Sequence, residues 1–195
     1  MTPAGFLRLA LQTLIAPREV ARLLLAADLS REAIMTAFAL VVVVNALVVG
    51  VMQGYGMAMD ALPVPVGPAI LAALLAGMLG ISIFVMTSAG RALGGSGRMQ
   101  DVAVLFIWLQ ALRALVQVGV ALMAMISGSL AMVLVLAAML AGIRIVLNFL
   151  DVAHGLDNLF KALMVLILGA VGMVLLLSLL FSLMGLTPTG MTYDV

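Results

Sequence analysis

Two arginines, Arg113 and Arg144, lie inside long apolar runs that contain no acidic residue. A guanidinium stays charged at any physiological pH and presents five N–H donors in a rigid fork. Placing such a group within a membrane is costly, and it commonly marks a functional position. Because the fork matches phosphate and carboxylate oxygens, the pair is a candidate anion-binding site.

Each arginine belongs to a stripe of polar side chains at helical spacing. One stripe falls at i, i+3 and i+7 and the other at i, i+4 and i+7, so each occupies one helix face. The stripes are Gln110, Arg113 and Gln117, and Arg144, Asn148 and Asp151. We expect both to face the protein interior. Both arginines lie about fifteen residues, roughly 20 Å, from the turn between the two runs, so we expect them to be near neighbours.

Two interpretations of these polar residues remain open. In the structural one, Arg144 reaches toward Asp151, and Arg113 bonds nearby polar groups that lock the helices together. Those groups are free carbonyls and the side chains of Gln110, Gln117 and Asn45. In the functional one, both arginines line a vestibule that faces the cytoplasm and bind an anion, such as a lipid phosphate of the inner leaflet.

The remaining reactive residues favour neither catalysis nor a metal site. The chain has no cysteine and one histidine, His154, so thiolate chemistry is excluded and a lone imidazole is expected to make interfacial hydrogen bonds. No serine within the apolar runs has a histidine at its depth, and the acidic residues lie in loops or at helix ends. We therefore expect no enzyme, no metal and no organic cofactor.

Five apolar runs position these residues, and each is near or above the ~20 residues that cross a ~30 Å hydrocarbon layer as a helix. They cover about 33–53, 66–88, 102–126, 130–150 and 162–183. Hydrophobic residues make up 66% of the 195 positions and charged residues 9%, and the mean hydropathy is +1.37. Since lipid satisfies no backbone polar group, we predict an all-α integral membrane protein whose five-helix domain covers 32–185.

The cations fall in alternate connections. They are Arg8, Arg18, Arg22 and Arg31 before the first run, Arg91 and Arg98 between the second and third, and Lys161 at the start of the fifth. By the positive-inside rule, the N-terminus is cytoplasmic and the tail at 186–195 lies outside, as in a multi-pass inner-membrane protein. A net charge of +1 without a cationic face excludes nucleic acid as a partner.

Residues 1–31 read as an amphipathic segment of two short helices lying flat in the inner interface. Pro17 suits the first position of the second helix, and Ser30 is the expected N-cap of the first span. The third and fourth runs are separated by three residues only, so they must form an antiparallel hairpin. Small residues at four-residue spacing in several runs permit close helix packing within the chain or in a homodimer.

Several of these features occur in an order that resembles bacterial members of the Yip (Ypt/Rab-interacting protein) domain family over nearly the whole chain. The matching stretches are Leu14-Ile15-Ala16-Pro17-Arg18-Glu19, Ala21-Arg22-Leu23-Leu24, Gly94-Gly95-Ser96-Gly97 with Asp101, Trp108-Leu109-Gln110, and Asn148-Phe149 leading into His154-Gly155. The resemblance implies five membrane helices with the N-terminus inside. It marks Gly94, Gly95, Gly97, Trp108, Asn148, His154 and Gly155 as family-pattern positions without a known task.

For eukaryotic relatives the resemblance implies membrane trafficking and contact with Rab-type small GTPases. Those relatives carry a longer soluble N-terminal region, whereas about 30 mostly amphipathic residues precede the first span here, so a small GTPase is not the expected partner. We expect a non-enzymatic membrane protein that binds lipids or other membrane proteins as a scaffold. The alternatives are a small transporter or channel with an anion or lipid-phosphate site at Arg113 and Arg144, and an accessory subunit of a larger complex.

Overall fold

The protein is all-helical in the computed structural model, which describes residues 2–54 and 67–183. Within them lie two short helices and five helices long and apolar enough to cross a membrane, as predicted. The short helices are α1 (Pro3–Ile15) and α2 (Pro17–Ala26), and the long ones are α3 (Arg31–Gly54), α4 (Pro68–Ala92), α5 (Met99–Ile126), α6 (Gly128–His154) and α7 (Leu159–Leu183). The predicted outer tail and most of the loop after α3 fall outside the described residues.

Local signals begin and end these helices. The Thr2 hydroxyl accepts a hydrogen bond from the Gly5 N–H (3.2 Å), which caps α1. Pro17 occupies the first turn of α2, where its missing N–H costs nothing. The Ser30 hydroxyl accepts from the Ala33 N–H (3.2 Å), as expected of an N-cap. At the end of α6, Gly155 takes the left-handed conformation (φ +60°) that closes a helix.

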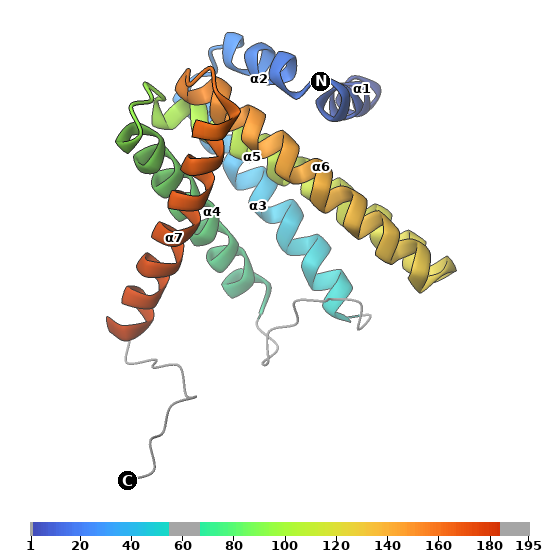
Figure 1. The fold of residues 1–195 in the computed structure, drawn as a ribbon. Coiled ribbons are helices and arrows are strands. Elements are labelled where there is room, and N and C mark those ends of the chain that lie inside the picture. The colour runs from blue at the N-terminus through green and yellow to red at the C-terminus, as the bar shows by residue number, and fades with distance from the viewer. Residues whose placement is uncertain (1, 55–66, 184–195) are drawn as a thin grey trace.

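The long helices form a row that closes at one end and spreads at the other. Helix α3 packs between α4 and α5, α5 pairs with α6 as the predicted hairpin, and α4 pairs with α7. At the closed end α6 also packs against α7, and α1 and α2 lie across this end together with the connections at 93–98 and 155–158 (Figure 1). We call this the α1/α2 end. Toward the other end α6 and α7 diverge (Figure 1).

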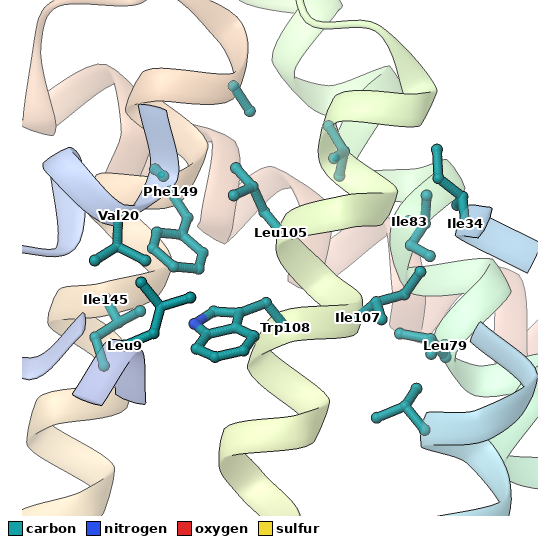
Figure 2. Packing of buried hydrophobic residues seen from close by; sticks show 14 of the residues in the cluster. Leu9, Val20, Ile34, Leu79, Ile83, Leu105, Ile107, Trp108, Ile145 and Phe149 are labelled. Carbon is teal, nitrogen blue, oxygen red and sulfur yellow. The ribbon is translucent and has the colours of Figure 1, made fainter. Parts of the chain in front are cut away.

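The main hydrophobic core lies at the α1/α2 end. Figure 2 shows Trp108 and Leu105 of α5 directed toward Leu9 of α1, Val20 of α2 and Phe149 of α6. Val20 is fully buried, and Leu105 and Phe149 are each 1% exposed. The two short helices are therefore integral to the packing, because they supply one wall of this core.

Helix α1 also presents apolar side chains outward. Leu11 is 63% exposed and Ile15 is 78% exposed. Exposure of this much leucine and isoleucine to water is unfavourable, whereas lipid accepts it without cost. The outer face of α1 is thus suited to the membrane interface, where we expect the N-terminal segment to lie.

Candidate functional site

The position of α1 indicates how deep the two arginines lie. Helix α1 packs beside Trp108 of α5, and the roughly 18 residues from there to Ile126 rise about 27 Å, close to the ~30 Å hydrocarbon thickness. We therefore expect the level of α1 to mark one membrane surface. Arg113 is about five residues, or 8 Å, further in, and Arg144 is about 24 Å from the far end of α6 by the same rise. On this expectation both arginines lie just inside the surface beside α1.

Arg144 binds the end of α1. Its guanidinium donates to the carbonyl oxygen of Leu14 (2.9 Å) and to that of Ile15 (3.3 Å). The last carbonyls of a helix have no partner within the helix and carry partial negative charge, so a cation there is favourable. The expected approach of Arg144 to Asp151 is not what the structure shows. Asn148, one turn away, donates its side-chain amide to the Arg144 carbonyl oxygen (2.7 Å).

Asp151 is paired with a different helix. Its carboxylate, 4% exposed, forms a salt bridge with Arg18 of α2 and accepts a hydrogen bond from the Asn158 N–H (2.9 Å). Sequence reasoning placed Arg18 among the topology-setting cations and gave it no partner. No spacing rule connects residues so far apart in the chain, and only the docking of α2 on α6 brings them together.

Arg113 is exposed, and no described residue pairs with its guanidinium. It lines a cleft of about 470 Å³ between α1, α5 and α6. Apart from Arg113 the lining is apolar, and it consists of Leu7, Ala10, Leu11, Leu14, Leu109, Leu112, Leu115, Val116, Ala138, Ala141, Gly142 and Ile145. The expectation that both polar stripes face the interior is therefore wrong for the two arginines, because α1 occupies the groove between α5 and α6 and leaves them at its edge.

The other predicted polar residues bind locally. The Asn45 side-chain amide donates to the Val41 carbonyl oxygen (2.8 Å) and to that of Gln110 (3.2 Å), which ties α3 to α5. Thus Gln110 contributes its backbone rather than its side chain. The Oε1 atom of Gln117 is buried without a hydrogen-bond partner among the described residues. Neither Asn45 nor Gln117 supplies the hydrogen bond to Arg113 that the structural interpretation expected.

Trp108 holds α1 against α5. Its indole N–H donates to the Thr13 hydroxyl (3.1 Å), which in turn donates to the Leu9 carbonyl oxygen (2.8 Å). The Phe6 ring meets the indole edge-on at a centroid distance of 5.3 Å. Trp108 and Thr13 are both buried, so this bond is shielded from water. The family-pattern tryptophan is therefore an anchor for the interfacial helix.

Replacing Thr13 by valine is expected to lower the free energy of unfolding by about 2 kcal/mol, since the buried indole N–H of Trp108 loses its acceptor. Unfolding can be followed by the emission of Trp108, the only tryptophan in the chain. Thr36→Val is the control, because that exposed hydroxyl bonds only the Glu32 carbonyl of its own helix. Equal stability of the two variants would show that the Thr13 bond is not significant.

The glycine-rich connection and His154 form one unit. The imidazole is 1% exposed, its Nδ1 lies 3.1 Å from the Leu150 carbonyl oxygen, and its backbone carbonyl accepts from the Ser96 N–H (3.0 Å). A Cβ atom added at Gly95 or Gly97 would come within 2.7 Å or 2.6 Å of the His154 side chain. His154 is thus a buried, hydrogen-bonded residue at the end of α6 that glycines enclose.

Gly90 of α4 belongs to the same enclosure and was missed by sequence reasoning. A Cβ there would lie 2.1 Å from Cδ2 and Nε2 of His154. The available signal was a glycine next to Arg91 in the last turn of a span, which does not reveal what approaches it. The family-pattern residues Gly94, Gly95, Gly97, His154 and Gly155 therefore lie together, whereas Trp108 and Asn148 lie along the spans.

A second cleft, of about 580 Å³, lies on another side of α5, between it, α3 and the short helices. Its lining is apolar throughout and consists of Phe6, Leu24, Leu29, Ile34, Ala37, Leu40, Val41, Val44, Val48, Val104, Ile107, Trp108, Ala111, Ala114, Leu115 and Val118. We call it the α3/α5 cleft, and the one beside Arg113 the Arg113 cleft. The hypothesis of a vestibule lined by both arginines is met only in part, because Arg113 lines its cleft and Arg144 does not. The α3/α5 cleft was not predicted, since its volume depends on how far the helices separate.

Five apolar spans crossed at one end by two short helices define a multi-pass α-helical membrane protein. The model of the Yip1 domain matches residues 11–180, which is most of the chain, and the protein therefore belongs to the Yip1 domain family. This confirms the resemblance seen in the sequence. No curated protein and no solved structure matches the chain.

Proposed function

We propose that this Yip1-family protein is a non-catalytic lipid-binding protein that organises the membrane around it. The observation that carries the proposal is the pair of largely apolar clefts beside α5, both at the end where α1 and α2 lie. Because the cations of the connections gather at this end, we place it at the cytoplasmic face of the inner membrane.

The dimensions of the α3/α5 cleft suit a lipid chain. The cleft extends along α3 from Ile34 to Val48, a rise of about 21 Å, and starts beside Leu29 just before that helix. One leaflet contributes about 15 Å of the hydrocarbon thickness. A chain as long as one leaflet is thick would thus fit along the cleft, against apolar side chains alone.

The transporter alternative requires a polar path across the membrane. In the Arg113 cleft the one charged lining residue lies near the α1/α2 end, and the rest of the lining is apolar. Such a site suits binding at one leaflet better than passage through both. The accessory-subunit alternative needs a large protein-binding face. The exposed leucines and valines of α7 do not favour it, because they suit contact with lipid equally well.

The experiment fills the α3/α5 cleft and counts the lipids that stay bound. Ala111 lines this cleft on α5, and Ala111→Phe places a ring where a chain would lie. We expect native mass spectrometry in mild detergent to find lipid retained by the wild type and at least about fivefold less retained by the variant, because each displaced methylene forfeits about 0.8 kcal/mol.

The matched control is Ala137→Phe on α6, where the alanine is exposed and lines neither cleft. It should retain lipid as the wild type does. A wild-type protein that sheds all lipid at the first wash, or an Ala111→Phe variant that retains as much as Ala137→Phe, would refute the proposal.

A further inference from the structure

The guanidinium of Arg113 has no described partner, although the structure satisfies comparable groups elsewhere. Arg144 binds the carbonyl oxygens that end α1, and Arg18 binds a buried carboxylate. Arg113 shares its cleft with apolar side chains only. A permanent charge just inside a membrane surface gains a great deal from an anion, because no other group there offsets the loss of water.

The shape of the cleft narrows the class of anion. Leu7, Leu11 and Leu14 of α1 form one wall, and α5 and α6 form the others. A small hydrated anion would leave most of this apolar volume uncovered. A molecule that joins one negative group to a hydrocarbon chain matches both the single charge and the apolar walls, so the complementarity is to an amphiphile.

The depth of Arg113 fits the same class. It lies about 8 Å inside the level of Trp108, where α1 lies, which is within reach of an arginine side chain extending toward lipid phosphates. The fork of a guanidinium binds two phosphate oxygens at once. A phospholipid of the adjacent leaflet can therefore meet the guanidinium with its phosphate while its chain runs deeper, toward Val116 and Gly142.

We propose that the Arg113 cleft binds one anionic phospholipid of the leaflet next to α1, with its phosphate on Arg113 and an acyl chain between α5 and α6. This inference rests on the proposed lipid-binding function and names the ligand class of one of its two clefts. Arg144 serves the site indirectly, since it holds α1 in place as the outer wall.

The test measures lipid selectivity in the full-length protein. Protein in nanodiscs with equal amounts of phosphatidylglycerol and phosphatidylethanolamine is extracted in mild detergent, and the retained lipids are counted by native mass spectrometry. The wild type should retain phosphatidylglycerol preferentially. In Arg113→Gln the ratio of retained phosphatidylglycerol to phosphatidylethanolamine should fall about tenfold, since a charge-assisted bond is lost. Arg113→Lys, which keeps the charge, should retain part of the preference.

The matched control is Arg22→Gln, which removes an exposed cation from α2 outside the cleft and should leave the ratio unchanged. Thermal unfolding of each variant shows that it is folded. Equal ratios of retained phosphatidylglycerol to phosphatidylethanolamine in the wild type and Arg113→Gln would overturn the inference. Lipid retained by both proteins would still support the proposed function. Loss of all lipid from the wild type would instead refute the function itself.

A second variant tests the chain-binding part of the cleft. Gly142 lines the cleft, and a Cβ atom added there meets no atom within 4 Å, so a leucine side chain can begin there without strain and extend into the cleft. Gly142→Leu should reduce retained phosphatidylglycerol several-fold although Arg113 is intact. Inorganic phosphate in excess should not displace the lipid from the wild type. Displacement by phosphate, with no effect of Gly142→Leu, would mean a site for a free anion and would overturn the inference.

Discussion

Gly90→Ala is expected to lower the free energy of unfolding by about 3 kcal/mol, at the upper end of the cost of overpacking a core. The new methyl carbon would lie 2.1 Å from the His154 ring. The ring cannot move away easily, because it is fully enclosed and its Nδ1 is bonded to the Leu150 carbonyl. The connection at 93–98 and the end of α6 must therefore separate. Unfolding in a mixed-micelle denaturant series measures the change.

The control for this variant lies on the same helix. A Cβ atom at Gly77 meets nothing within 4 Å, so Gly77→Ala should be neutral or stabilise α4 by up to about 1 kcal/mol through helix propensity. Combining Gly90→Ala with His154→Ala should restore part of the stability that each change removes, because the second change empties the space that the first requires. Additive losses would show that the glycine and the histidine are not in contact.

Arg18→Gln is expected to destabilise the protein by about 3 kcal/mol, since it leaves the buried carboxylate of Asp151 without its counter-charge. Most of this loss comes from the unpaired carboxylate, because the Asp151 side chain is 4% exposed and cannot be solvated by water. The Arg18 side chain is 43% exposed. After the change Asp151 keeps one hydrogen bond, from the Asn158 N–H. The same denaturant series measures this loss, and the docking of α2 should weaken with it.

Asp151→Asn should cost less, about 1 kcal/mol, because the half-exposed Arg18 can regain water and the amide still accepts from Asn158. The double variant should be more stable than Arg18→Gln alone. An Arg18→Gln variant as stable as the wild type, or one less affected than Asp151→Asn, would contradict the assigned pair and its asymmetry. Arg22→Gln, on the exposed side of α2, is the matched control.

The five spans were predictable because apolar run length alone decides them. The first was expected over 33–53 and is Arg31–Gly54. The second was expected to end at 88, yet α4 continues to Ala92. The added turn contains the charged Arg91, whose Nε donates to the Gly97 carbonyl oxygen (3.1 Å). A search for apolar runs does not detect a helix end that is polar.

The partners of the charged residues were not predictable from spacing. The sequence places Asp151 one turn beyond Asn148 and two turns beyond Arg144, which favoured a bond within α6. Arg144 instead binds the end of α1 and Asp151 binds Arg18 of α2. Helix periodicity tells which residues share a face, but it does not tell which other helix covers that face.

The chain's composition and residue order determine its membrane character and the number of its spans, because transfer into lipid depends on each segment's own side chains. They also determine the family and identify the charged residues that could bind an anion. Packing of the helices alone decided that Arg144 binds the end of α1 while Arg113 lines a cleft without a described partner. It also decided the glycine enclosure of His154 and both clefts. Each of these features involves groups more than fifty residues apart in the sequence. Such groups interact only in the folded protein.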